Sequence, residues 1–75
     1  MKRAGTVVGA AGGVIVVRSP DDSYPRVGSE LLDEHLERVG EVVDVFGPVE
    51  RPYLAVAPRE EGRRVRLVGS DLYVK

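Results

Sequence analysis

The chain has 75 residues, no cysteine, no tryptophan and a single histidine, and its 11 basic and 12 acidic side chains leave a net charge of -1. This composition excludes disulfide staples and thiol catalysis and argues against an ordinary zinc site. The near balance of charge argues against a free-standing nucleic-acid-binding protein, since such proteins usually carry a strongly basic face. The length predicts one domain, residues 1–75, near the lower limit for a self-sufficient core.

The N-terminal part predicts a β-hairpin. Residues 3–10 read as a strand weakened by glycine, and residues 14–18 are an uninterrupted β-branched run that ends in arginine. The Ala-Gly-Gly turn between them is a hairpin signal. A phosphate-binding loop would need a following helix and a lysine, and neither follows these glycines. The expected element is a tight hairpin of a small barrel.

Residues 29–38 leave two readings open. Leucines at 31, 32 and 36 recur at helical spacing behind Ser29, which is a fair N-cap, so local propensity favours a short amphipathic helix. The alternative is a strand through Leu31 and Leu32, a turn at 33–35, and a second strand that begins near Leu36. His35 has no nucleophile or second ligand nearby, so it is not a catalytic candidate.

The stretch around which the rest of the chain is arranged is residues 39–56. Two runs of residues that suit strands, among them Val, Phe and Tyr, flank a corner that contains Gly47, Pro48 and Pro52. Glycine and proline favour turns, because glycine permits unusual backbone angles and proline fixes φ. Phe46, the only phenylalanine, stands at the edge of this corner. The pattern predicts two strands joined by a stiff apolar corner that either closes a barrel or docks on a partner.

The C-terminal part combines a charged loop with two short apolar runs. The arginines that could contact RNA phosphates are Arg59, Arg63, Arg64 and Arg66. Glu60 and Glu61 are interleaved with them, so a solvated loop is the simpler interpretation. Several short strands separated by turn signals predict a small all-β barrel or sandwich. A closed barrel is favoured because closure removes unpaired strand edges.

The signature of a known family lies in the central stretch. The run Gly40-x-Val42-x-x-Val45-Phe46-Gly47-Pro48-Val49-x-x-Pro52-Tyr53 closely resembles that of the H/ACA ribonucleoprotein subunit whose eukaryotic forms carry glycine–arginine-rich tails. The likeness extends to residues 27–33 and to the terminal Gly-x-x-Leu-Tyr-Val at 69–74, so it covers nearly the whole chain. Both tails are missing here, which looks like the short archaeal form. A eukaryotic assembly factor contains the same barrel, but with long extensions.

The resemblance implies a small closed six-stranded antiparallel Greek-key barrel of the translation-protein (reductase/elongation-factor) type. Strands are then expected near 3–10, 13–19, 28–33, 37–46, 52–58 and 71–75. This expectation decides residues 29–38 in favour of strand, turn and strand, because closure of a barrel can override a weak local preference.

The resemblance also implies a role without catalysis. Members of the family dock on the archaeal pseudouridine synthase catalytic subunit (dyskerin-type), touch guide RNA only indirectly, and influence substrate RNA loading and product release in rRNA pseudouridylation. No catalytic residue, metal, cofactor or small-molecule ligand is expected, and neither is a membrane partner, since no apolar run approaches the roughly 20 residues of a membrane helix. The expected location is the archaeal cytoplasm. The alternative is a free-standing small-barrel RNA-binding protein that would use the four arginines and Tyr53 or Tyr73.

The corner is the expected partner-binding surface. Its candidate residues are Phe46, Gly47, Pro48, Val49, Pro52 and Tyr53. Val45 and Phe46 point to opposite faces of a regular strand, so only one of them can face the core. We expect Val45 inside and Phe46 at the rim. The simpler alternative is that Phe46 fills the barrel and the prolines only shape the turn.

Overall fold

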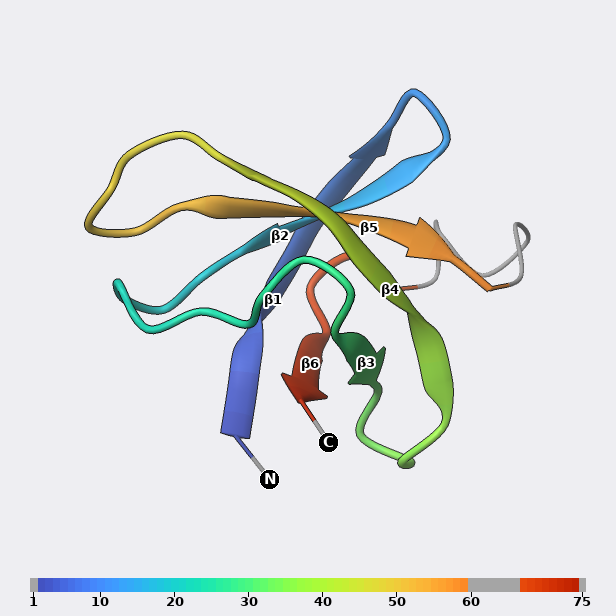
Figure 1. Ribbon diagram of the computed structural model, residues 1–75. Coiled ribbons are helices and arrows are strands. Elements are labelled where there is room, and N and C mark those ends of the chain that lie inside the picture. Colours follow the sequence, from blue (N-terminus) through green and yellow to red (C-terminus); the bar gives the residue numbers. More distant parts are fainter. Residues whose placement is uncertain (1, 60–66, 75) are drawn as a thin grey trace.

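The strands of this chain close into a barrel (Figure 1). The computed structural model describes residues 2–59 and 67–74. Its elements are β1 (Lys2–Ala11), β2 (Val14–Arg18), β3 (Glu30–Leu32), β4 (Arg38–Phe46), β5 (Tyr53–Pro58) and β6 (Asp71–Val74). All neighbours are antiparallel, in the closed order β1-β2-β5-β4-β3-β6. Strands β3, β4 and β5 are successive neighbours and β6 returns beside β3, which is the Greek-key order. The predicted all-β barrel is confirmed.

Aliphatic side chains fill the barrel. Alternate residues of β2 and β5 point inward, so Ile15, Val17, Leu54 and Val56 are fully buried. The core cluster of described residues is Ala4, Val7, Ile15, Val17, Leu31, Val39, Val42, Leu54, Val56, Leu67 and Leu72. β-Branched residues suit such a pleated surface, since their side chains are stiff and pack across neighbouring strands. This cluster contains no aromatic ring, so Phe46 does not belong to the core.

The segment between β3 and β4 is a tight turn and not a helix. The Asp33 carboxylate accepts hydrogen bonds from the backbone N–H groups of His35, at 2.8 Å, and Glu37, at 3.0 Å. Leu36 adopts a φ of 63° and is 60% exposed, whereas Leu31 is completely buried in the barrel. The local helix signal is therefore wrong, and strand, turn and strand is confirmed. Burial of Leu31 in the core outweighs the few tenths of a kcal/mol per residue that helix propensity supplies.

We expect Asp33→Ala to lower the free energy of unfolding by about 1–2 kcal/mol, because two N–H donors of the turn would lose their acceptor. Asp33 is only 4% exposed, so water cannot freely replace its carboxylate. Urea unfolding followed by circular dichroism would measure the change. Glu34→Ala, in the same turn but exposed, is the matched control and should stay within about 0.5 kcal/mol of wild type. Equal losses in both variants would show that the carboxylate does not hold the turn.

Candidate functional site

The β4–β5 connection forms a fixed corner, residues 46–53. Phe46 and Tyr53 are direct register partners at its base. Gly47 has a φ of 90°, and a Cβ atom placed there would lie 2.9 Å from the Tyr53 ring, so only glycine fits without a shift. The Arg51 N–H donates to the Pro48 carbonyl oxygen at 3.2 Å and closes the turn. The corner is therefore a defined turn: Gly47 supplies the positive φ, and the Pro48 carbonyl oxygen accepts the hydrogen bond that closes it.

A β-bulge decides which residues of the corner face outward. The register of β4 against β5 shifts between Val42 and Asp44, which makes Val43 an extra residue. Without it, strict alternation from the buried Val42 would turn Phe46 into the barrel. With it, Val45 packs against the core and Phe46 is 44% exposed. The expectation of Val45 inside and Phe46 at the rim is confirmed.

The corner is tied to the end of β2. The Ser19 N–H donates to the Pro52 carbonyl oxygen at 3.0 Å, and the Arg51 Nε donates to the Ser19 carbonyl oxygen at 2.9 Å. Ser19 is fully buried, and Pro52 is buried as well. Figure 1 shows the two connections, 19–28 and 47–52, emerging on the same side of the barrel. These bonds hold the corner in one position relative to the sheet.

A row of three side chains crosses the outer surface at the base of the corner. The rings of Phe46 and Tyr53 are stacked, with centroids 5.5 Å apart and planes inclined by 20°. On the other side of Tyr53, the Arg18 guanidinium carbon lies 4.7 Å from the ring centroid, and Nη1 donates to the Tyr53 hydroxyl at 2.6 Å. The strand register places these residues side by side on β4, β5 and β2. Sequence reasoning missed Arg18, because only the β2–β5 register shows that it faces Tyr53.

The candidate partner-binding residues differ in exposure. Val49 is 84% exposed and is the most exposed large hydrophobic side chain of the described part, while Gly47 and Pro48 are also exposed. Tyr53 is half-buried between its two neighbours in the row, and Pro52 is buried. A protein partner could therefore touch Phe46, Gly47, Pro48 and Val49 directly, while Pro52 shapes the corner.

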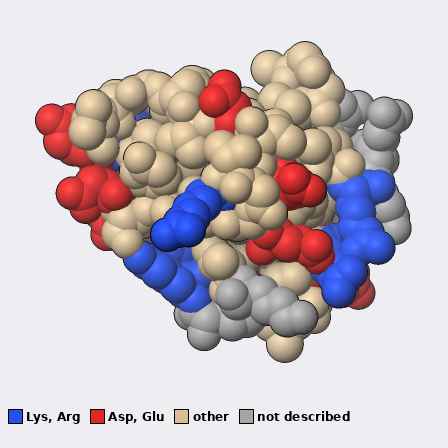
Figure 2. Space-filling view, viewed as in Figure 1, with Lys and Arg blue, Asp and Glu red and all other residues tan. Residues whose placement is uncertain are grey.

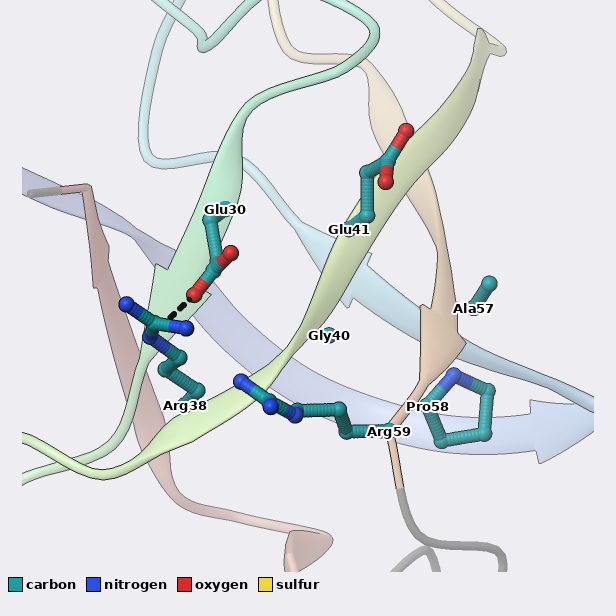
Figure 3. A pocket seen from close by; sticks show the side chains of 7 residues that line it. All are labelled: Glu30, Arg38, Gly40, Glu41, Ala57, Pro58 and Arg59. Carbon is teal, nitrogen blue, oxygen red and sulfur yellow. Dashed lines mark ion pairs between the residues drawn. The ribbon is translucent and has the colours of Figure 1, made fainter.

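The arginine cluster can be placed only in part. Arg63, Arg64 and Arg66 lie outside the described residues. Arg59 is exposed and lines an open pocket of about 370 Å³ (Figure 3). The pocket is lined by Glu30, Arg38, Gly40, Glu41, Ala57, Pro58 and Arg59. Two acidic and two basic side chains line it, and Arg38 forms an ion pair with Glu30, with 2.7 Å between Nε and Oε1. Such a mixed pocket has little net attraction for phosphate.

The other polar groups of the described part bear on metal binding and on the distribution of charge. Within residues 2–59 and 67–74, no three His, Cys, Asp or Glu side chains are placed so that they could hold a metal ion. The same ranges contain no helix of the length and apolarity needed to cross a membrane. On the face shown in Figure 2, acidic and basic side chains lie next to one another and form no broad area of one sign. The candidate binding site on the described surface is therefore the corner together with the row of Phe46, Tyr53 and Arg18.

Comparisons with known proteins find similarity by family model, by sequence and by structure. The family model described as the Gar1/Naf1 RNA binding region matches residues 1–75. A curated protein of Methanothermobacter thermautotrophicus, described only as uncharacterized, is 32% identical over 65 residues, which cover 83% of this chain and 68% of that protein. The solved structure of the Gar1 domain of Naf1 superposes with a TM-score of 0.75 at 20% identity, over 99% of this chain and 85% of that one. At that identity the superposition supports the barrel fold.

Proposed function

We propose that this chain, which belongs to the Gar1/Naf1 RNA binding region family, is a non-catalytic subunit of an H/ACA guide ribonucleoprotein. In this proposal it docks on the archaeal pseudouridine synthase and aids substrate RNA loading and product release during rRNA pseudouridylation in the cytoplasm. The family is an RNA-binding accessory family, which agrees with a supporting role. Guide RNA would be contacted mainly through the assembled particle.

The observation that carries this proposal is the fixed, exposed corner. Rigid aromatic and apolar anchors are the groups on which protein interfaces depend most, because little conformational entropy is lost when they are buried. Val49 and Phe46 are held open to solvent by the bulge and by the bonds between the corner and β2. A small barrel gains nothing in stability from a valine that is 84% exposed. A partner that covers the corner would bury these two apolar side chains and gain binding free energy from them.

A direct RNA-binding role is the second candidate, and two observations favour it. The family is described by RNA binding, and the Phe46–Tyr53–Arg18 row resembles the stacking surfaces on which proteins bind single-stranded bases. Against this role stands the small charge of the chain, -1 overall. Affinity for phosphates rises with the number of basic groups engaged, so a near-neutral chain should bind RNA weakly by itself.

We expect the isolated protein to bind the purified synthase in the absence of RNA and to bind guide RNA alone only weakly. Fluorescence anisotropy at about 0.15 M salt, with either the synthase or the guide RNA as titrant, would measure both affinities. Submicromolar binding of guide RNA without the synthase would favour the RNA-binding candidate. Failure to bind the synthase with or without guide RNA would reject the docking role.

A further inference from the structure

One side chain ties two separate connections of the barrel together. Arg51 lies in the corner, and its Nε donates to the carbonyl oxygen of Ser19, the first residue after β2, at 2.9 Å. The two residues are 32 positions apart in the sequence. This hydrogen bond therefore joins the corner to the 19–28 connection, which leaves the barrel on the same side (Figure 1).

Ser19 is a rigid acceptor for this bond. It is completely buried, and its own N–H donates to the Pro52 carbonyl oxygen at 3.0 Å. The next residue is Pro20, which restricts the backbone of the residue before it. The Ser19 carbonyl group thus belongs to the fixed part of the fold, and the bond from Arg51 attaches the corner to it.

The tip of the corner has little else to hold it. Residues 47–51 are all exposed, so burial contributes little to keeping them in place. The stacked rings of Phe46 and Tyr53 fix the base of the corner, below the tip. Arg51 acts on the tip twice, since its backbone N–H closes the turn on Pro48 at 3.2 Å and its side chain reaches Ser19.

The chemistry of the bond indicates orientation of the chain and not pairing of charge. The nitrogen that donates is Nε, the one nearest the backbone, and the acceptor is an uncharged carbonyl oxygen. A neutral donor at the same place could make the same bond. What the bond requires is a donor at a fixed distance from the backbone of residue 51, whereas the charge of the guanidinium is not needed for it.

We propose that Arg51 is a positioning residue, which holds the tip of the corner against Ser19 and so keeps Val49 in the arrangement that the partner binds. Its contribution to docking does not come from contact with the partner. This inference rests on the proposed function, in which the corner docks on the synthase. If the tip moved freely, only the fraction of molecules with the bound arrangement would dock, and the apparent Kd would rise in inverse proportion to that fraction.

The test uses two substitutions that differ at the position of Nε. Arg51→Gln places an amide nitrogen at the same number of bonds from the backbone, so it keeps the donor and loses the charge. Arg51→Met places a methyl group there and loses both. Arg51→Met should weaken binding to the synthase about three- to tenfold, which is the range for loss of one hydrogen bond, while Arg51→Gln should stay within about twofold of wild type. Arg51 is exposed, so both variants should fold, and thermal melts would verify this.

A second measurement follows the corner in the free protein. The Ser19 N–H donates to Pro52, so its hydrogen exchange, followed by NMR, reports how often the corner leaves β2. In Arg51→Met this amide should exchange faster than in wild type, and in Arg51→Gln it should exchange at a similar rate. Amides of the β2–β5 ladder should keep their protection in both variants, because a positioning role leaves the barrel closed.

The outcomes separate this inference from the function on which it rests. A wild-type chain that does not bind the synthase would overturn the docking function and the positioning role with it. Wild-type binding together with equal binding by Arg51→Met would overturn the positioning role alone, and so would an unchanged exchange rate of the Ser19 amide in that variant. Equal weakening of binding by Arg51→Gln and Arg51→Met would assign the effect to the charge of the guanidinium and would also overturn it.

Discussion

Gly40→Ala is expected to lower the free energy of unfolding by about 3 kcal/mol or more, at the upper end of overpacking effects. A Cβ atom on residue 40 would lie 2.1 Å from the carbonyl oxygen and 2.9 Å from the carbonyl carbon of Ala57. Both contacts are with backbone, so no side chain can rotate away. Strand β4 would have to move from β5, its neighbour at this point. Small domains have only about 5–15 kcal/mol of stability in total, so this loss should remove about a fifth of it or more.

Gly9→Ala is the matched control for this prediction. Gly9 also lies in a strand, but nothing stands within 4 Å of a Cβ atom built on it. Alanine should be neutral or slightly stabilising there, because it restricts the unfolded chain more than glycine does. Urea unfolding of both variants would measure the two free energies. If Gly40→Ala were as stable as Gly9→Ala, the close approach of β4 and β5 at the pocket would be wrong.

Glycine and proline separate the apolar runs in the sequence and predict a small all-β barrel or sandwich. The six strand ranges came from the family resemblance, and each lies within two residues of the observed strand as far as the described residues extend. Local patterns failed in the segment 29–38, where the helical spacing of the leucines predicts a helix but the barrel requires a strand, a turn and a second strand. Its turn depends on the Asp33 carboxylate and on a positive φ at Leu36, neither of which periodicity can indicate.

The candidate site was predicted only in outline, since its details depend on register. The composition of the corner marks Phe46 and Val49 as unusual, but the one-residue bulge at Val43 is what exposes Phe46. Pro52 looks equivalent to Pro48 in the sequence, yet it is buried. Arg18 contacts a tyrosine 35 positions away, and no local pattern connects them.

Contacts within the aromatic row also decide which substitution tests docking cleanly. Tyr53 stacks on Phe46 and receives a hydrogen bond from Arg18, so Tyr53→Ala would alter stability together with binding. Val45→Ala would leave a cavity beside the core and should cost about 1–3 kcal/mol of stability, with no direct effect on the partner. Neither variant therefore changes binding to the partner without changing stability.

Val49→Asp does separate them, and we expect it to reduce affinity for the synthase roughly 30- to 150-fold, or about 2–3 kcal/mol, with little change in stability. The side chain is 84% exposed in the free chain, so an aspartate there remains hydrated and the melting temperature should stay within a few degrees of wild type. In the complex the same carboxylate would be desolvated against an apolar surface without a partner.

Glu50→Gln, at the neighbouring exposed position, controls for a local change of charge and should bind within about twofold of wild type. Titration calorimetry with the synthase and a thermal melt of each variant give both quantities. Unchanged affinity of a folded Val49→Asp would place the docking surface away from the tip of the corner, whereas loss of the fold would make the corner a structural hinge.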